Sequence, residues 1–374
     1  MNIPGFVDLQ VNGYKGVDFS SPDLTADSFA RASRELLTQG TAAFLPTLIT
    51  CPEEVYRRNL AIIGQACAQP EFEGRLLGIH VEGPFLSRAP GAVGAHNPAY
   101  VRDPDPQLLD RMQQWAGGRI RMITVAADAP GAEELVRDCG LRIADCGLKR
   151  NRMPTARLDA ASSNSQFAIR NPQLNDAQPG GSPRRLPQFM GITVSLGHHM
   201  ANEEQLGRMA RAGARALTHL GNGVPAMLPR HPNPIWAGLA CDDLAALVIA
   251  DGHHLPPSVL KTILRTKGVA RTIVTSDQTA VAGLAPGRYH AFGTDVVLEE
   301  SGRLYVPDKG CLAGSSATML VCMNHLASLG LLTLEEMEQV GYFNPLRLIG
   351  VDPRAIRSPN QLAYDDARAQ FVRL

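Results

Sequence analysis

The chain has 374 residues, with 36 basic and 36 acidic side chains and therefore no formal net charge. This length is normal for one α/β barrel, which can exceed about 250 residues when it carries insertions. The balanced charge gives no reason to expect a nucleic-acid partner or attraction to a membrane surface.

The cysteines and the hydropathy pattern indicate the cellular compartment. The seven cysteines are scattered and form no C-x-x-C pair. Their odd number favours reduced thiols, so we expect a cytoplasmic protein. No basic stretch followed by an apolar segment opens the chain, so no signal peptide is expected. No apolar run approaches the roughly 18 residues of a membrane-spanning helix.

Short apolar runs alternate with amphipathic segments along the chain. The runs predict eight strands, at Gly5–Val11, Ala42–Leu48, Leu76–Glu82, Ile120–Ala126, Ile192–Gly197, Ala214–His219, Ala245–Ala250 and Thr272–Ser276. The segments between them predict helices, at Thr25–Thr38, Pro52–Ala68, Asp105–Trp115, Ala132–Asp138, Asn202–Arg211 and Pro256–Thr266. Alternation of this kind predicts an α/β fold, either a (β/α)8 barrel or a doubly wound open sheet. The barrel is favoured because polar residues follow many different strands.

One stretch, Lys149–Gln188, breaks the alternation. It is rich in Ser, Asn, Gln, Pro, Gly and Arg and has no sustained apolar period. A segment of this composition is either disordered or a functional lid. We therefore expect residues 1–350 to form the barrel, with an insert at about 149–188, and residues 351–374 to form a C-terminal tail.

Three polar residues each end an apolar run: Glu82, His198 and His219. The carboxyl ends of barrel strands meet on one face, so these side chains are expected to lie close together. One carboxylate and two imidazoles suit a zinc-like cation that keeps a position open for water. This pattern predicts a metal-dependent hydrolase.

The order of several short motifs extends this interpretation. The motifs are Pro4–Asp8, His80–Phe85, Ser195–His198, Thr218–Asn222, Ala250–His254, Thr275–Asp277 and Leu312–Ser315. In this order they resemble the N-acetylglucosamine-6-phosphate deacetylase family of the amidohydrolase superfamily. The resemblance implies hydrolysis of the N-acetyl group of N-acetylglucosamine 6-phosphate, giving glucosamine 6-phosphate and acetate in amino-sugar catabolism.

The resemblance also concerns a small domain. Members of the family usually have β-strands before the barrel, which combine with C-terminal strands into a small β-sandwich. Here the chain starts almost at the first barrel strand, and the tail around Asn360–Asp366 supplies one strand at most. We therefore expect the small domain to be truncated or absent, with residues 351–374 as its remnant.

The metal number follows from the first strand. Superfamily barrels often carry His-x-His there for a second metal, whereas this chain has Gln10 and Asn12. Amides are poor ligands for transition metals compared with imidazole. We expect these two positions to be vestigial, with one divalent ion per subunit held by Glu82, His198 and His219. Zinc is the first choice, and iron, manganese or cobalt would also suit these ligands.

The resemblance implies roles for further residues. Asp277 matches the general base, which takes a proton from the water and gives it to the leaving amine. His96, after Ala95, matches a histidine that contacts the substrate near its acetyl oxygen. A turn or N-cap aspartate and an exposed loop histidine are the structural alternatives for these two residues.

Substrate contacts are expected around the sugar phosphate. The residues implied are Asn222, Gly223, Arg230 and His254, together with Leu312, Ala313 and Gly314 in a loop that closes over the sugar. His199 and His253 are expected outside the direct contacts. In the family a neighbouring subunit often contacts the phosphate, so a homodimer is expected.

Two alternatives remain open from the sequence. The Pro-rich loop after Asn222 differs from the usual family loop, which leaves another N-acetyl amino-sugar phosphate, such as the galactosamine epimer, or a cyclic amide as substrate. The insert and the missing strands leave a degenerate barrel that binds a sugar phosphate without hydrolysing it.

Overall fold

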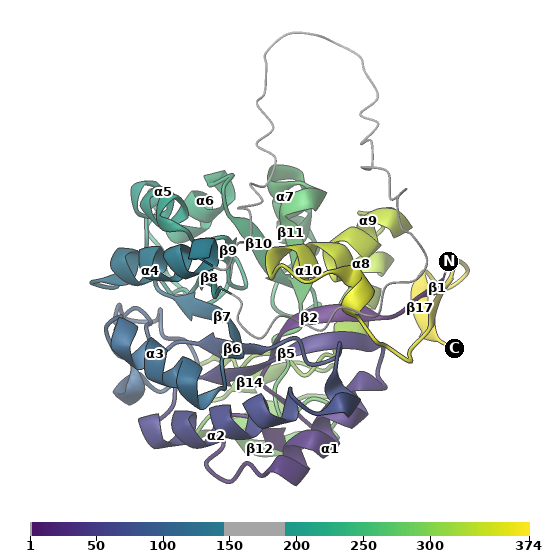
Figure 1. Ribbon diagram of the computed structural model, residues 1–374. Coiled ribbons are helices and arrows are strands. Elements are labelled where there is room, and N and C mark those ends of the chain that lie inside the picture. Colours follow the sequence, from purple (N-terminus) through teal and green to yellow (C-terminus); the bar gives the residue numbers. More distant parts are fainter. Residues whose placement is uncertain (1, 146–190) are drawn as a thin grey trace.

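The computed structural model describes residues 2–145 and 191–374, and its centre is a barrel of parallel strands surrounded by helices (Figure 1). The barrel strands are β2 (Phe6–Val11), β5 (Thr41–Ile49), β6 (Ile79–Glu82), β7 (Ile120–Val125), β8 (Thr193–Leu196), β9 (Ala216–Leu217), β10 (Ala245–Ile249) and β11 (Thr272–Thr275). Their order in the sheet is their order in the chain, and neighbouring strands run parallel. The order never reverses, which excludes the doubly wound alternative and confirms the predicted (β/α)8 barrel.

The first and last barrel strands meet at a seam without a regular ladder. One parallel bridge joins Val11 to Gln278, and the backbone N–H of Asn12 donates to Gln278 O at 2.8 Å. Side chains supply further connections across this seam: Asp8 accepts from Thr275 and Ser276, and Gln278 Nε2 donates to Gly13 O. The seam therefore lies directly beside the functional end of the barrel.

Helices cover the outside of the barrel. Those that follow the strands are α1 (Ala26–Leu37), α2 (Glu53–Ala66), α3 (Pro106–Trp115), α4 (Ala132–Asp145), α5 (Glu203–Ala212), α6 (Pro234–Ala240), α7 (Pro257–Lys267) and α8 (Met319–Ser328). All six helices predicted between the strands are present. Side-chain caps fix several of their starts, since Thr25 and Asn202 form capping boxes and Asp105 accepts from two backbone N–H groups.

The core has two layers because the strand residues alternate. In β2, Phe6 packs outward against the helices, whereas Val7 and Leu9 point into the barrel. A register shift between Asp8 and Val11 interrupts the alternation and places Val11 in the outer cluster with Phe6. Barrel strands are buried on both faces, as parallel sheets require. This explains why the strands are continuous apolar runs in the sequence.

A small antiparallel sheet follows β11 and was not predicted. It consists of β12 (Gly287–Ala291), β13 (Thr294–Leu298), β14 (Leu304–Val306) and β15 (Cys311–Leu312). Its own apolar cluster, which includes Val296, Leu304 and Val306, is separate from the barrel core. A pair of two-residue strands, β3 (Gly13–Tyr14) and β4 (Val17–Asp18), follows β2.

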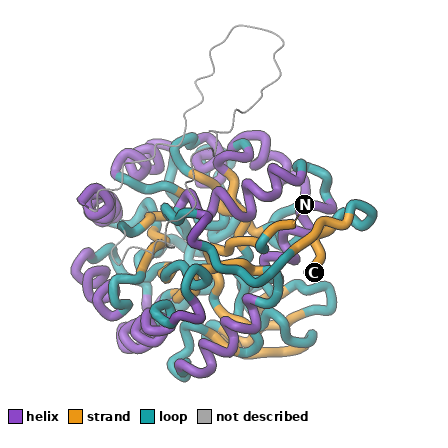
Figure 2. The backbone as a smooth tube through the Cα atoms, turned by 45° about the vertical axis from the view of Figure 1, so that its right-hand side comes forward, coloured by secondary structure: helices purple, strands orange, loops and turns teal. Residues whose placement is uncertain are grey.

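The C-terminal tail forms more structure than expected. After α9 (Leu334–Glu338) and α10 (Asn344–Leu348), strands β16 (Leu362–Asp365) and β17 (Gln370–Arg373) pair with each other and with β1 (Asn2–Ile3). The expectation of one strand at most is wrong, because a turn after Asp365 returns the chain as β17. The two ends of the chain therefore lie close together (Figures 1 and 2).

Other expectations about the chain have different outcomes. The predicted insert at about 149–188 lies outside the described residues. The division at residue 350, with the tail as a remnant of a small β-domain, stays a prediction. None of the helices in the two described parts of the chain has the length and apolar character to cross a membrane. Short helical turns of other types occur at Pro70–Phe72, Pro98–Tyr100, Val269–Arg271, Gln339–Phe343 and Pro353–Ala355.

Candidate metal centre and active site

Four polar residues at strand ends line one cavity at the carboxyl face of the barrel. Glu82 is the last residue of β6, and His198, His219 and Asp277 each lie two residues beyond β8, β9 and β11. The cavity has a volume of about 490 Å³, which is within the usual range for small-molecule sites. The barrel therefore brings together residues that are almost 200 positions apart.

The backbone is strained at three of these positions. The φ angles of His198, His219 and Asp277 are 52°, 34° and 51°. Residues other than glycine rarely adopt positive φ, and each such residue costs about 1–3 kcal/mol. Strain at three strand ends that share one cavity is typical of a functional site, because the fold must hold these side chains in place.

Three donor atoms form a compact triangle. Glu82 Oε1 lies 3.2 Å from His198 Nε2 and 3.0 Å from His219 Nε2, and the two imidazole nitrogens are 3.2 Å apart. A tetrahedral ion with bonds of about 2.0 Å separates its ligands by about 3.3 Å. All three side chains are buried. The triangle therefore fits three ligands of one divalent metal ion.

The position of the hydrogen on the His198 ring also fits a metal ion bound at this triangle. His198 Nδ1 lies 2.8 Å from the carbonyl oxygen of Ala92, which can only accept, so Nδ1 carries a hydrogen. In a neutral ring Nε2 is then a lone pair that faces the Glu82 carboxylate. A positive charge is needed to stabilise this arrangement, and a hydrogen bond from the second ring nitrogen to a carbonyl is typical of a metal ligand.

The loop after β9 packs closely against this triangle. Gly223 has φ +64°, and a Cβ there would lie 2.8 Å from His219 Cε1 and 3.1 Å from His198 Nδ1. Any larger residue would displace the imidazoles. The glycine thus contributes to the position of the two histidines.

The electrostatics of Glu82 depend on the imidazoles. Burial alone would raise the pKa of this carboxyl group, but its close contacts with the His198 and His219 side chains hold its pKa well below the usual range. Glu82 is therefore present as a carboxylate, the form that binds a cation.

His96 stands beside this triangle but is bonded differently. Its Nδ1 accepts from the backbone N–H of Thr50 at 3.4 Å and lies 3.0 Å from Thr50 Oγ1. Nε2 then carries the hydrogen and lies 3.8 Å from Glu82 Oε2. Burial lowers the pKa of His96 to about 3, so the ring is neutral. Glu82, His96 and His198 also have donor atoms within 4.8 Å of one another, yet this tautomer suits a hydrogen-bond donor better than a ligand.

Asp277 faces the triangle from the opposite strand end. Its Oδ1 accepts a hydrogen bond from Asn12 Nδ2 at 2.8 Å. Burial raises the pKa of Asp277 to about 8, and repulsion from Glu82 adds to this shift. A carboxyl group that titrates near neutral pH can both accept and release a proton.

A second hydrogen-bond cluster fixes the orientation of His254. The Asp251 carboxylate accepts from the backbone N–H groups of His253 and His254 and from Ser315 Oγ. Its Oδ2 also lies 2.8 Å from His254 Nδ1. Nδ1 is therefore the donor, and Nε2 offers a lone pair. Because His254 lines the cavity, this lone pair is available to a ligand.

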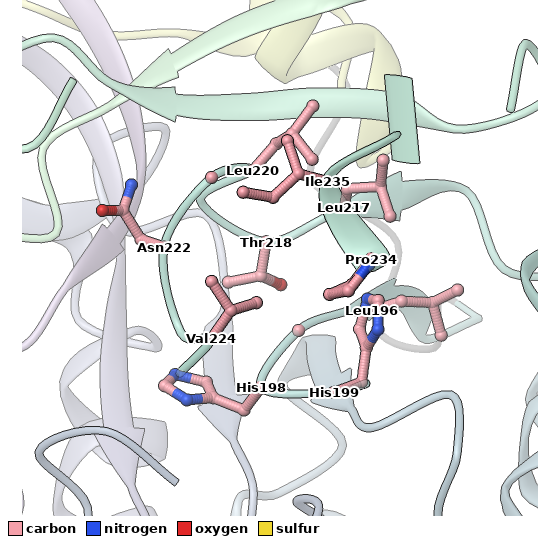
Figure 3. Close-up of a pocket in the computed structure, with 12 residues that line it drawn as sticks. Leu196, His198, His199, Leu217, Thr218, Leu220, Asn222, Val224, Pro234 and Ile235 are labelled. Atoms are coloured by element: carbon pink, nitrogen blue, oxygen red, sulfur yellow. The ribbon is translucent and has the colours of Figure 1, made fainter. Parts of the chain in front are cut away.

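His199 and His253 stay outside the cavity, as expected. His199 follows His198, but the two rings point away from each other, and His199 lies beside a smaller hollow of about 20 Å³ next to Pro234 (Figure 3). Burial lowers the pKa of His199 to about 4, and its Nδ1 accepts from Ala201 N. His253 Nε2 lies 3.0 Å from the Ser301 carbonyl.

The cavity collects most of the predicted site residues. Those that line it are Asn12, Glu82, Ala95, His96, His198, His219, Asn222, Gly223, His254, Asp277, Leu312 and Gly314. Three others do not: Ala313 is fully buried, Arg230 is exposed, and Gln10 is buried with neither amide atom bonded to any described residue. Lys309 and Phe292 also line the cavity and were missed. Both lie in turns of the unpredicted sheet, so no strand-end pattern indicated them.

Comparison with known proteins places the chain in a family. No protein-family model matches the sequence. The chain is 30% identical over 362 residues to N-acetylglucosamine-6-phosphate deacetylase from Bos taurus, which covers 94% of this chain and 75% of that protein. It is 25% identical over 351 residues to N-acetylgalactosamine-6-phosphate deacetylase from Escherichia coli O157:H7, covering 93% and 78%.

A solved structure agrees with this at the level of the fold. The deacetylase of N-acetyl-D-glucosamine 6-phosphate from Mycobacterium smegmatis superimposes with a TM-score of 0.77 at 24% identity, covering 99% of this chain and 84% of that chain. The barrel and its sequence relatives thus lead to one assignment. Because 94% of the chain aligns with the bovine enzyme at 30% identity, the chain belongs to the N-acetylglucosamine-6-phosphate deacetylase family.

Proposed function

We propose that this protein hydrolyses the N-acetyl group of N-acetylglucosamine 6-phosphate, releasing glucosamine 6-phosphate and acetate in amino-sugar catabolism. The observation that carries the proposal is the triangle of Glu82, His198 and His219, which shares one cavity with Asp277. The names of the relatives support the choice of substrate.

Glu82, His198 and His219 hold one divalent ion per subunit in this proposal. When bound, the ion lowers the pKa of a water molecule and polarises the acetyl carbonyl group. We choose zinc because two imidazoles, one carboxylate and an open position are typical of catalytic zinc sites. Iron, manganese and cobalt also bind such donors. Gln10 and Asn12 offer amides only, which supports a single ion.

Asp277 carries the proton in the proposed reaction. It removes a proton from the attacking water and delivers it to the nitrogen of the leaving amine. The oxygen of the water becomes part of acetate, and the C–N bond breaks. One carboxylate can make both transfers because the first proton is the one that the amine needs.

Two histidines bind the substrate. The Nε2–H group of His96 points toward the metal triangle and donates to the oxyanion that develops on the acetyl carbonyl. His254 Nε2 accepts from a sugar hydroxyl group, since Asp251 fixes its other nitrogen as a donor. Asn222 Nδ2 has no partner among the described residues and is available to the substrate.

A homodimer completes the proposal. Arg230 is exposed and does not line the cavity of its own subunit. Met227 and Trp236, on the same segment, are 88% and 51% exposed. An exposed apolar segment beside an arginine suits a subunit contact. We place Arg230 at the site of the neighbouring subunit, and we place the enzyme in the cytoplasm because no disulfide joins two described cysteines.

A second substrate has a specific observation in its favour. A relative of similar coverage is named for N-acetylgalactosamine 6-phosphate, and this sugar differs from the first at one hydroxyl group only. The loop between Asn222 and Pro234 has an unusual sequence, with several prolines. The galactosamine epimer is therefore the alternative substrate.

The test is acetate release from both sugars, each with and without phosphate, with metal content measured on the same protein sample. The proposed function predicts the highest kcat/KM for N-acetylglucosamine 6-phosphate. Preference for the galactosamine epimer would establish the alternative. Metal-loaded protein that releases no acetate from any of the four sugars would show a degenerate barrel instead.

A further inference from the structure

The small sheet β12–β15 forms one wall of the active-site cavity. Its turn between β14 and β15 carries Lys309, and its turn between β12 and β13 carries Phe292; both residues line the cavity. The sheet packs through its own apolar cluster, which includes Ala313 beside the substrate loop. The position of Lys309 is therefore set by a separate structural unit that faces the barrel.

The turn that carries Lys309 is well defined. Val306 and Cys311 pair across it, and the Val306 carbonyl accepts from the N–H groups of Lys309 and Gly310 at 3.3 and 2.9 Å. Gly310 has φ 61°, the left-handed conformation that closes a tight turn. This anchoring fixes the base of the lysine side chain and leaves its end free.

Lys309 is the only lysine or arginine among the described residues that line the cavity. The same lining carries two acidic groups, Glu82 and Asp277. Within the two described parts of the chain, no carboxylate or carbonyl oxygen pairs with the Lys309 ammonium group, and its side chain is exposed.

An anionic substrate needs such a group. A sugar phosphate brings up to two negative charges into a cavity that already contains two carboxyl groups. Lysine binds phosphate as a flexible point charge, and each charge-assisted contact strengthens binding about ten- to hundredfold. Arg230 cannot serve within one subunit because it lies outside the cavity.

We propose that Lys309 binds the phosphate group of the substrate and sets the preference for phosphorylated over unphosphorylated N-acetyl sugars. The inference rests on the proposed function for its substrate class. It assigns the phosphate contact to the cation on the cavity wall, in addition to any contact from a neighbouring subunit.

The test compares three variants with N-acetylglucosamine 6-phosphate and N-acetylglucosamine. Lys309→Met keeps the side-chain length and removes the charge, and Lys309→Arg restores it. Arg288→Met removes one charge from an exposed position of the same sheet, outside the cavity, and controls for the general field. Lys309→Met should raise the KM for the phosphorylated sugar about ten- to hundredfold, with kcat within about twofold and no effect on the unphosphorylated sugar. Lys309→Arg should recover most of the KM, and Arg288→Met should behave as wild type.

An unchanged ratio of kcat/KM between the two sugars in Lys309→Met would overturn this inference while leaving the deacetylase proposal intact. Calorimetric measurement of glucosamine 6-phosphate binding tests the opposite case, in which the deacetylase proposal fails but Lys309 still binds phosphate. If wild type releases no acetate but binds this sugar phosphate, and Lys309→Met loses binding, the proposed function fails and the role of Lys309 stands.

Discussion

The side-chain amide of Asn12, just after the first barrel strand, donates a hydrogen bond of 2.8 Å to Oδ1 of Asp277, just after the last. Asn12 occupies a position expected to be a vestige of a second metal site. Instead it restrains the carboxylate proposed as the proton carrier, and it leaves Oδ2 without this restraint. Asn12 thus stands where the superfamily often has a ligand of a second metal, and here its side chain orients Asp277.

Asp277→Asn should abolish turnover while the metal stays bound. Asparagine keeps the shape of the side chain and its contact to Asn12, but it cannot accept and release a proton. General acid–base groups contribute about 10²–10⁴-fold to rate, so kcat should fall by that factor. Steady-state kinetics and elemental analysis on one preparation check both parts. Activity within a few-fold of wild type would exclude Asp277 as the proton carrier.

Removal of single histidines should identify the metal ligands. His198→Ala and His219→Ala should each weaken metal binding by more than about 100-fold, because loss of an outer partner alone costs 10–100-fold. His96→Ala should keep the metal and lower kcat by about 10²–10³-fold, as expected for an oxyanion donor. Competition with a chelator measures the affinities. Loss of metal in His96→Ala with retention in His219→Ala would replace the proposed triangle by Glu82, His96 and His198.

The sequence predicted the barrel because its strands are buried on both faces and appear as uninterrupted apolar runs. Helix α6 was missed because it has only seven residues, too few to show a helical period. The sheet β12–β15 was missed because its strands are short and half-exposed, with a burial pattern that breaks at each turn. Local patterns were therefore informative where burial was deep.

Some residues of the site could be predicted from the sequence and others could not. Glu82, His198, His219 and Asp277 each follow a buried strand, so their convergence could be predicted from the geometry of a barrel. Lys309 and Asp251 could not be found in this way. Lys309 reaches the cavity from a separate sheet, and Asp251 acts through its contact with His254. Arg230, which the resemblance implies as a phosphate contact, does not line the cavity of its own subunit, and its contact with substrate stays a prediction.

Asp8 should matter for both stability and catalysis, because its buried carboxylate joins the two strands of the seam. It accepts from Thr275 Oγ1 at 2.7 Å, from Ser276 N at 3.1 Å and from Ser276 Oγ. Asp8→Asn replaces one of the two accepting oxygens with an amide NH2 group, which cannot accept from these donors, and should lower the free energy of unfolding by about 2–4 kcal/mol. Since Ser276 precedes Asp277, kcat should also fall at unchanged metal content.

Asn344→Ala is the matched control for Asp8→Asn. Asn344 Nδ2 donates to the carbonyl groups of Val269 and Thr272, at the other end of β11. This variant should lose stability to urea without a comparable loss of kcat. If Asp8→Asn and Asn344→Ala reduce kcat equally, the seam contact has no specific role in positioning Asp277.

Asp18 should make stability depend on pH. Burial raises its pKa from 3.8 to about 6, although Ser20 N donates to its carboxylate at 2.8 Å. The unfolded chain releases this proton near pH 3.8, whereas the folded protein holds it up to about pH 6. The contribution of the Asp18 pKa shift to the free energy of unfolding is therefore complete below pH 3.8 and is lost as the pH rises through 6.

Asp18→Asn should remove this loss, because asparagine keeps the acceptor for Ser20 and has no charge to bury. A shift of about two pKa units corresponds to at most about 3 kcal/mol, and the partial exposure of Asp18 reduces the expected gain to about 1–2 kcal/mol at pH 7.5. The gain should shrink toward zero at pH 4. Urea unfolding in a chelating buffer measures it without a contribution from metal release. Asp23→Asn, at an exposed position of the same segment, should stay within about 0.5 kcal/mol of wild type at both pH values; an equal gain at pH 4 and 7.5 for Asp18→Asn would contradict burial of its charge as the cause.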